Sequence, residues 1–270
     1  MQGSTLTRLV YVGGYGRSGS TLLEYLLAAS ADVVACGEVV LAAKRKDIPR
    51  CSCGQTRETC SFWSRLLTPE RPPGSWTHEG LMLALLDDCR DRFAVLVDSS
   101  KTARGSFLTP FAFRRRLGDD FKLIHLVREP HGVCWSRRSG KRVSDVENSP
   151  RRFARYVRTV AGWLAANMAC EAFGQRYPNQ YMRVRYEDLA SAPEETLRTI
   201  FERLHLGPAP RLDNLKASGN RHQLFGNRVR LHAPGPSEIR HDARWRNEMA
   251  APDRMLISAL SWPLRRRYGY

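Results

Sequence analysis

A short apolar strand that runs through a glycine-rich loop into a helix constrains the fold of this chain more than any other feature. Apolar residues occupy positions 9–12, the loop Gly-Gly-Tyr-Gly-Arg-Ser-Gly-Ser-Thr follows at 13–21, and a helical pattern continues to residue 29. Glycines let the loop present several backbone N–H groups to an anion, and the helix N-terminus adds about half a positive charge. The segment therefore predicts a site for a phosphate or sulfate ester, and taken alone it is also consistent with an ordinary strand-to-helix turn.

One position in the loop departs from the usual P-loop pattern of Gly, four residues, Gly, Lys and Ser or Thr. Gly14, Gly19 and Thr21 match the pattern, but Ser20 stands where the lysine is expected. The cation of the loop is Arg17 instead. A nucleoside triphosphatase uses the lysine on its β- and γ-phosphates together with Mg²⁺. A sulfuryl group carries less charge, so backbone amides, hydroxyls and protein cations can stabilise its transfer, and the loop favours sulfuryl over phosphoryl chemistry.

Short β-rich runs alternate with helical patterns along most of the chain, as expected for a parallel sheet covered by helices. The predicted strands cover residues 9–12, 33–36, 94–97, 122–127 and 181–184. The predicted helices cover residues 20–29, 78–92, 104–117, 130–138, 151–173 and 193–204. This alternation predicts a three-layer, P-loop-like α/β fold with a central parallel sheet flanked by helices, in one domain spanning residues 1–270.

The longest predicted helix, at 151–173, has apolar residues at helical spacing. Its predicted core residues are Phe153, Tyr156, Val157, Val160, Leu164 and Met168. The stretches 42–76 and 139–150 lack regular patterns, and loops of this length are often lids or binding loops. We therefore expect these two stretches to shape the substrate site.

The composition indicates a globular protein with a strongly basic surface. The chain has 270 residues, 42% of them hydrophobic, and a formal net charge of +16. No apolar run approaches the roughly 18 to 20 residues of a membrane span, and no signal-peptide pattern precedes the first strand. These features predict a cytoplasmic protein without a transmembrane segment. A basic surface attracts any anion, but no nucleic-acid-binding module can be recognised, so no nucleic-acid partner is expected. Nothing in the sequence indicates an oligomeric state.

Seven cysteines are scattered along the chain, and an odd number without a secretory pattern favours reduced thiols over a disulfide framework. Cys51, Cys53 and Cys60 form a cluster in sequence, with Cys36 upstream. Structural zinc sites usually have four ligands and a Cys-x₂₋₄-Cys spacing, which this cluster does not match. The sequence therefore favours incidental thiols and predicts no metal site, while metal binding and disulfides at these four cysteines stay open.

A second anion site is indicated where the strand at 122–127 ends. Arg128-Glu129-Pro130 follows this strand, and Ser136 stands eight residues after Arg128 in the helix that begins at the proline. Strand ends in a parallel sheet face the ligand crevice, so an arginine there and a hydroxyl in the next helix can hold one phosphate from two sides. Taken alone, the motif is also consistent with an arginine that only caps the strand.

Together the two motifs resemble those of sulfotransferases that use 3′-phosphoadenosine 5′-phosphosulfate (PAPS). The glycine loop is similar to their 5′-phosphosulfate loop, and Arg128 with Ser136 is similar to their 3′-phosphate site. Further segments resemble landmarks of the bacterial branch of that family: Cys36-Gly37-Glu38, Asp98-Ser99-Ser100-Lys101, residues 184–189 and residues 226–230. The first two also resemble segments of tyrosylprotein sulfotransferases. The resemblance spans about residues 9–230 and implies a PAPS-dependent sulfotransferase.

The resemblance also implies roles for individual residues. The 5′-phosphosulfate would be held by Arg17, Ser18, Gly19, Ser20 and Thr21, the 3′-phosphate by Arg128 and Ser136, and the adenine would lie near Tyr186. A late basic loop that closes over the nucleotide is resembled by Asn227, Arg228 and Arg230, although Arg228 replaces the usual proline. The implied co-substrate is PAPS, and the implied product is adenosine 3′,5′-bisphosphate (PAP).

Glu38 is the predicted general base. It follows the second strand, so it should lie near the glycine loop, where a carboxylate can take the proton from an acceptor hydroxyl as the oxygen attacks sulfur. Lys101 and Arg17 are the predicted catalytic cations, because positive charge stabilises the sulfuryl oxygens and the leaving phosphate. The alternatives are a solvated helix cap for Glu38 and an ordinary surface lysine for Lys101.

The predicted function is transfer of a sulfuryl group from PAPS to a hydroxyl or phenol of an acceptor that the sequence does not identify. A P-loop kinase is the alternative, because residues 93–98 can be read as a strand and an aspartate that holds Mg²⁺. A basic RNA- or membrane-surface-binding domain, supported by charge alone, is a third interpretation. The basic segments at 44–46 and 137–142 are equally consistent with an anionic acceptor and with a solvated surface.

Overall fold

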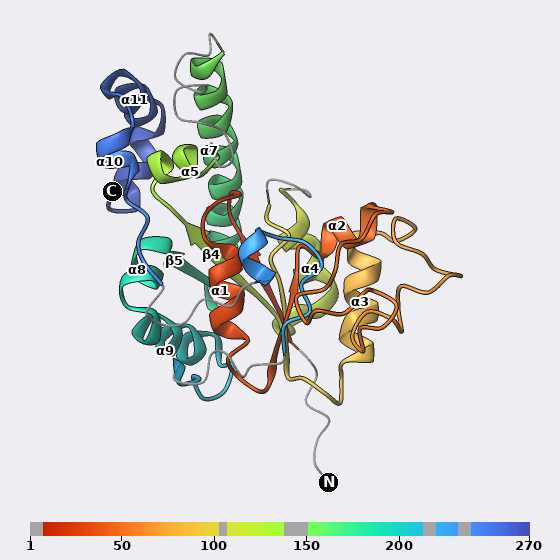
Figure 1. Cartoon of the computed structure of the whole chain (residues 1–270). Coiled ribbons are helices and arrows are strands. Elements are labelled where there is room, and N and C mark those ends of the chain that lie inside the picture. The colour runs from red at the N-terminus through yellow and green to blue at the C-terminus, as the bar shows by residue number, and fades with distance from the viewer. Residues whose placement is uncertain (1–7, 103–106, 138–150, 213–219, 232–238) are drawn as a thin grey trace.

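Five parallel strands form the central sheet, in the order β2-β3-β1-β4-β5 (Figure 1). They are β1 (Arg8–Gly13), β2 (Val33–Gly37), β3 (Val95–Asp98), β4 (Phe121–Val127) and β5 (Tyr181–Arg185). The computed structural model describes residues 8–102, 107–137, 151–212, 220–231 and 239–270. All five predicted strands are confirmed, each to within one residue at either end.

Helices connect the strands and cover both faces of the sheet. They are α1 (Ser20–Leu27), α2 (Val39–Lys44), α3 (His78–Asp88), α4 (Thr109–Leu117), α5 (Pro130–Ser136), α7 (Arg152–Arg176), α8 (Tyr186–Ser191), α9 (Pro193–Leu204), α10 (Trp245–Glu248) and α11 (Ala251–Arg267), with the short turns η1 (Gly118–Asp120), η2 (Pro178–Gln180) and η4 (Arg228–Leu231). The six predicted helices are present. Pro110 lies in the first turn of α4, a position that proline suits, and residues 104–106 of the predicted helix lie outside the described residues.

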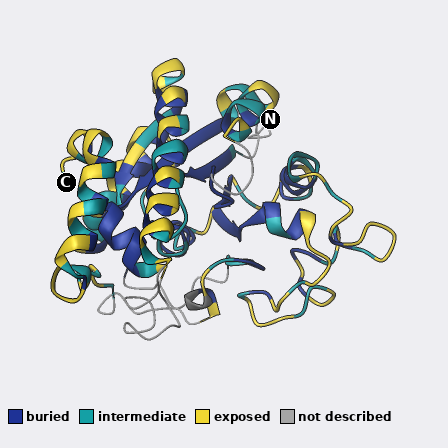
Figure 2. Cartoon of the chain, turned by 90° about the horizontal axis from the view of Figure 1, so that it is seen from above, coloured by how far each residue is buried: buried dark blue, intermediate teal, exposed yellow. Residues whose placement is uncertain are grey.

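The strands direct alternate side chains to two buried faces, which gives the fold three layers. Leu9 and Tyr11 of β1 face a core that includes residues of α2, α3 and α4. Val10 and Val12 face the opposite core, which α1 and α9 cover. Buried residues follow the sheet, and exposed residues lie on the outer sides of the helices (Figure 2). The predicted three-layer α/β fold is confirmed.

The predicted core face of the long helix α7 is confirmed only in part. Tyr156 and Val160 are buried as expected, but Phe153 and Val157 are each 44% exposed and Met168 is 59% exposed. The buried positions include polar and small residues: Thr159, Ala166, Asn167 and Gly174. Because such residues pack or hydrogen-bond inside the core, hydrophobicity alone selects the wrong edge of this helix.

The sequence patterns do not predict the C-terminal helix α11, which packs against α5 and α7. Met255 and Trp262 on α11 are 72% and 58% exposed, and Pro263 lies inside the helix. Its apolar side is therefore too weak for hydrophobic periodicity to identify. Within the described part of the chain, no helix combines the length and the apolar character needed to cross a membrane.

The strand order predicts a ligand crevice between the carboxyl ends of β1 and β4. The chain leaves β1 toward β2 and leaves β4 toward β5, so adjacent strands send their connections in opposite directions. Open α/β sheets bind ligands at such switch points. The glycine loop follows β1 and Arg128 follows β4, so both predicted anion sites flank this crevice.

Candidate active site

The glycine loop adopts a conformation that only glycine tolerates at two positions. Gly14 and Gly19 have φ values of 112° and 94°, in the left-handed region. A side chain at Gly14 would lie 2.5 Å from the carbonyl oxygen of Leu126, and one at Gly19 would lie 2.5 Å from a ring carbon of Tyr186. The loop is thus packed closely between the end of β4 and the residue predicted to lie near the adenine.

The loop also holds a buried hydroxyl that the protein itself leaves unsatisfied. Ser18 is 2% exposed, and its hydroxyl has no hydrogen-bond partner among the residues that the structure describes. Buried polar groups normally have a partner, so this hydroxyl indicates room for an external acceptor or donor. Ser20 begins α1, and the Thr21 hydroxyl accepts a 3.4 Å hydrogen bond from the backbone N–H of Asn227. These contacts fit an anion bound at the start of α1.

Arg128 joins the two predicted anion sites. Its guanidinium donates a 3.0 Å hydrogen bond to the carbonyl of Arg17 and lies 4.2 Å from the centre of the Tyr186 ring. The residue is only 5% exposed. Ser136 ends α5, and the structure shows no hydrogen bond between it and Arg128. The structure therefore brings Arg17, Arg128 and Tyr186 together, while the role of Ser136 stays a prediction.

A carboxylate that the sequence analysis did not connect to this site lies beside Arg128. Asp242 Oδ2 is 3.8 Å from the Arg128 guanidinium. Hydrogen bonding from Arg244 lowers the pKa of Asp242, and the charge of Arg128 acts in the same direction. Asp242 is therefore a native counter-ion at the cation expected to bind a phosphate.

Glu38 and Lys101 form a buried ion pair at the ends of β2 and β3. Lys101 Nζ donates to Glu38 Oε1 at 2.6 Å, and the two side chains are 7% and 8% exposed. Lys101 has a φ of 64°, a strained value for a residue with a side chain. The predicted base and the predicted catalytic cation are thus brought together, and neither is a solvated surface group.

The segment after β3 fixes the backbone that follows Glu38. Asp98 Oδ1 and Ser100 Oγ accept hydrogen bonds from the backbone N–H groups of Val39 and Val40, at 3.4 and 2.9 Å. Asp98 is fully buried and also pairs with His78 at 2.6 Å. Its carboxylate is therefore committed to structural contacts, and it does not suit the Mg²⁺-binding role required by the kinase alternative.

Glu24 of α1 is a site residue that sequence reasoning missed. Its carboxylate accepts three hydrogen bonds, from Gly37 N at 2.8 Å, Ser99 Oγ at 2.8 Å and Gln223 Nε2 at 2.7 Å. Burial raises the pKa of Glu24 to about 7, although these hydrogen bonds oppose the shift. Glu24 therefore holds three segments together: Gly37, which precedes Glu38, and the segments that carry Lys101 and Asn227. The sequence signal that could have identified Glu24 is an acidic side chain among the leucines of α1.

Substitution Glu24→Gln is expected to flatten the pH dependence of stability. The folded-state pKa is raised from an ordinary value of 4.5 to about 7, so the folded chain binds more protons than the unfolded chain between these values. Stability of the wild type should therefore fall as pH rises from 4.5 to 7, by up to about 3 kcal/mol. The glutamine variant lacks this titration. Unfolding free energies at pH 5 and pH 8 measure the effect, and identical pH profiles for both proteins would exclude it.

A late segment, residues 220–231, runs along the edge of β2 and reaches the site. Arg221 forms a parallel bridge with Ala35, and the Glu38 N–H donates to the Phe225 carbonyl at 3.4 Å. Arg230 is 8% exposed, and burial lowers the pKa of its guanidinium while the charge of Glu38 opposes the shift. Asn227 is exposed, and the side chain of Arg228 lies outside the described residues.

The sequence of this chain is similar to those of known sulfotransferases. A family model described as "Sulfotransferase family" matches residues 10–208. Human carbohydrate sulfotransferase 3 is 24% identical over 194 residues, which is 67% of this chain and 40% of the human protein. The chain thus spans about 40% of the length of this curated relative.

Solved structures show the same fold. The sulfotransferase domain of the Synechococcus PCC 7002 olefin synthase has a TM-score of 0.57 at 19% identity, covering 100% of this chain and 97% of that domain. The sulfotransferase domain from the curacin biosynthetic pathway has a TM-score of 0.57 at 18% identity, covering 94% and 97%. A mouse sulfotransferase solved with PAP has a TM-score of 0.50 at 12% identity, covering 97% and 88%.

Proposed function

The chain belongs to the sulfotransferase family, and we propose that it transfers a sulfuryl group from PAPS to a hydroxyl or phenol of an acceptor. The observation that carries the proposal is the buried Glu38–Lys101 pair near a glycine loop whose Ser18 hydroxyl is left unsatisfied. The mouse structural neighbour was solved with PAP, the nucleotide that this reaction would release.

The residues around the crevice suit the two ends of this nucleotide. Backbone N–H groups and hydroxyls at the start of α1 suit the 5′-phosphosulfate, and Arg128 suits the 3′-phosphate because a guanidinium pairs well with phosphate oxygens. Tyr186, which lies against Arg128 and Gly19, offers a ring face to the adenine. The complete proposed binding set is Arg17, Ser18, Gly19, Ser20, Thr21, Arg128, Ser136, Tyr186, Asn227, Arg228 and Arg230.

Glu38 and Lys101 suit the transfer step. Glu38 takes the proton of the acceptor hydroxyl, and the acceptor oxygen forms a bond to sulfur. The bond between sulfur and the 5′-phosphate oxygen breaks, and its electron pair stays on that oxygen. Lys101 and Arg17 stabilise the charge that develops there. The products are a sulfate ester and PAP.

We expect activity to be independent of Mg²⁺. The lysine of a P-loop kinase is replaced by Ser20, and Asp98 is occupied by His78 and Ser100. Turnover of PAPS should therefore survive a brief exposure to EDTA, measured with labelled PAPS while the metal content of the chain is followed in parallel. Complete loss of turnover that Mg²⁺ alone restores would favour the kinase alternative.

The acceptor is proposed to enter beside the late segment. A surface hollow there is lined by residues of the loop after α2 and of the late segment: Arg45, Asp47, Ile48, Pro49, Leu224, Phe225, Gly226 and Arg230. Phe225 contacts the backbone of Glu38, so this hollow adjoins the proposed base. The other loop expected to shape the substrate site, residues 139–150, lies outside the described residues. A screen of hydroxylated metabolites, glycans and tyrosine peptides with labelled PAPS would identify the acceptor.

A further inference from the structure

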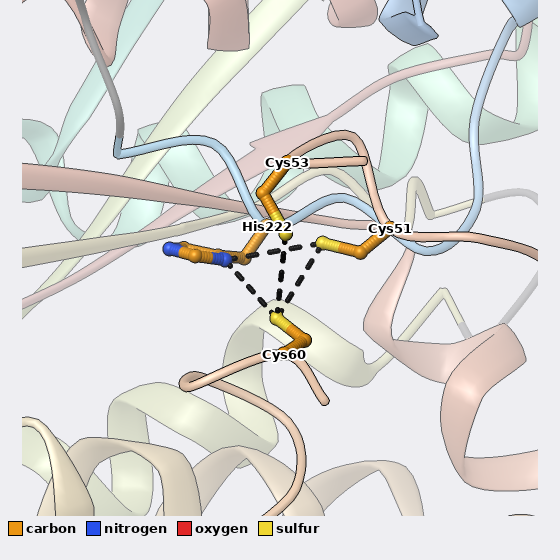
Figure 3. Close-up of side chains that lie close together, drawn as sticks. All are labelled: Cys51, Cys53, Cys60 and His222. Carbon is orange, nitrogen blue, oxygen red and sulfur yellow. Dashed lines mark hydrogen bonds between the residues drawn. The ribbon is translucent and has the colours of Figure 1, made fainter. Parts of the chain in front are cut away.

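Three cysteines and one histidine converge at one point where the loop after α2 meets the late segment. Cys51, Cys53 and Cys60 come from the loop after α2, and His222 comes from the late segment. Their sulfur atoms and the His222 Nδ1 atom all lie within 4.8 Å of one another. Figure 3 shows the four side chains pointing toward one another from these two parts of the chain.

Four of the six distances among these atoms are close to the edges of a tetrahedral metal site, and all six are within 4.8 Å. The Cys60 sulfur lies 3.7 Å from the sulfurs of both Cys51 and Cys53 and 3.3 Å from His222 Nδ1. Cys51 Sγ lies 3.8 Å from the same nitrogen. Zinc bonds of about 2.3 Å to sulfur and 2.0–2.1 Å to nitrogen require edges of about 3.6–3.8 Å. We propose that Cys51, Cys53, Cys60 and His222 bind one Zn²⁺ ion.

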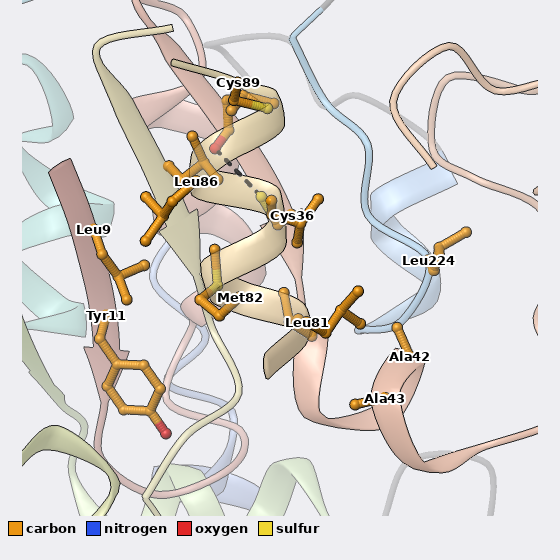
Figure 4. Packing of buried hydrophobic residues seen from close by; sticks show 14 of the residues in the cluster. Leu9, Tyr11, Cys36, Ala42, Ala43, Leu81, Met82, Leu86, Cys89 and Leu224 are labelled. Atoms are coloured by element: carbon orange, nitrogen blue, oxygen red, sulfur yellow. Dashed lines mark hydrogen bonds between the residues drawn. The ribbon is translucent and has the colours of Figure 1, made fainter. Parts of the chain in front are cut away.

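The chemistry of the donors favours zinc over the other uses of these thiols. Three sulfurs and one imidazole nitrogen form a complete set for tetrahedral zinc, with no open position for a substrate. A disulfide needs a sulfur–sulfur distance of about 2.05 Å and would leave the third cysteine and His222 without a role. Cys36 and Cys89 lie elsewhere, in the core beside α3 (Figure 4). The site is therefore structural, not catalytic.

Neighbouring residues already hold His222 in position. Its ring stacks on Phe62 with centroids 4.9 Å apart and an angle of 6° between the planes. Trp63 Nε1 donates to the His222 carbonyl at 2.6 Å. The Ser52 N–H donates to the Gln223 carbonyl at 3.0 Å, and the Gln223 N–H donates to Ser52 Oγ at 2.9 Å. These hydrogen bonds join the loop after α2, which carries the three cysteines, to the late segment on both sides of the proposed ion.

The proposed ion would anchor the segment that reaches the active site. From His222 the chain continues to Gln223, which binds Glu24, then to Phe225, which binds the backbone of Glu38, and to Asn227, which binds Thr21. Metal binding at such a site contributes directly to folding free energy. The link to nucleotide binding rests on the proposed function, whereas metal binding itself does not.

Metal analysis of the purified chain tests the site without an activity assay. Protein prepared with zinc and a reductant should retain about one zinc per chain after dialysis. Cys53→Ser and His222→Ala should each lower the retained zinc by at least about tenfold, and Cys53 is exposed, so its substitution should leave the fold intact. Cys89→Ser, which removes a buried thiol outside the cluster, is the control for loss of a thiol as such and should retain zinc.

Cobalt spectroscopy distinguishes this ligand set from adventitious binding. Co²⁺ in place of zinc should give the intense visible bands of a tetrahedral thiolate site, and these bands should weaken in Cys53→Ser while Cys89→Ser keeps them. Wild-type protein that holds no zinc and gives no tetrahedral cobalt spectrum would overturn the proposal. Zinc retained equally by Cys53→Ser and His222→Ala, or a disulfide among the three cysteines found by mass spectrometry of protein purified without reductant, would also overturn it. PAP binding is measured on the same samples as an independent readout. Failure of the zinc proposal can then be distinguished from failure of the proposed function.

Discussion

Replacing Glu38 with glutamine is expected to lower turnover by about 10² to 10⁴-fold while PAP affinity stays nearly unchanged. Glutamine keeps the size and polarity of the side chain but cannot accept the proton of the acceptor hydroxyl. Lys101 Nζ, now 2.6 Å from Glu38, can still donate to the amide oxygen, so the site should stay folded. Turnover is measured with labelled PAPS on an acceptor found by screening, and affinity is measured by calorimetry with PAP.

Two comparisons make this result specific. An acceptor phenol of low pKa needs less help to lose its proton, so it should partly rescue Glu38→Gln but not Lys101→Ala. Glu79→Gln alters an acid at the surface that pairs with Arg116, and it should leave turnover unchanged. A Glu38→Gln enzyme as fast as the wild type on an alcohol acceptor would contradict the assignment of the base. The next candidates would be His131 of α5, which pairs with Glu129, and His222, with Cys53→Ser as a control for loss of metal.

The variants Arg128→Ala and Arg17→Ala should each weaken PAP binding by about 1.5–3 kcal/mol, or about 10- to 150-fold. Arg128 lies buried between Arg17 and Tyr186 at the crevice between β1 and β4, where its charge is only partly offset by Asp242. Calorimetry gives the affinities, and circular dichroism checks the fold.

Conservative variants separate charge from folding at this site. Arg128→Lys keeps a cation but loses the planar guanidinium, so its affinity should lie between those of the wild type and Arg128→Ala. Arg116→Ala removes an exposed arginine of α4 that pairs with Glu79, and it should not change affinity. Unchanged PAP affinity in both Arg17→Ala and Arg128→Ala would remove the nucleotide assignment.

Local sequence patterns predicted the strands well because the residues of each strand, and those directly beside it, mark its position. The β1 strand is apolar on both faces and is followed by glycines, so both its position and its burial could be inferred. Hydrophobic periodicity failed where packing uses polar or exposed residues. In α7, Asn167 is buried because it hydrogen-bonds to His125, whereas Met168 faces solvent. In α11, exposed Met255 and Trp262 obscure the buried side of the helix.

The predicted site residues that the structure brings together stand at the ends of neighbouring strands. Glu38 and Lys101 follow β2 and β3, and parallel strands bring such ends to one edge of the sheet. Contacts between residues far apart in the chain left no pattern in the sequence from which they could be predicted. His222 lies 162 residues after Cys60, and Asp242 lies 114 residues after Arg128, so no spacing rule connects either pair.

The melting temperature of the chain with PAP, compared with ATP and Mg²⁺ and with RNA, distinguishes a PAPS-dependent sulfotransferase from a kinase and from an RNA-binding domain. A ligand that binds only the folded state stabilises it by RT ln(1 + [L]/Kd), about 2.7 kcal/mol at a hundredfold excess over Kd. We expect a clear rise in melting temperature with PAP, a smaller rise or none with ATP and Mg²⁺, and loss of the PAP effect in Arg128→Ala. A protein that PAP does not stabilise, but that ATP with Mg²⁺ or RNA does, would contradict the proposed sulfotransferase function.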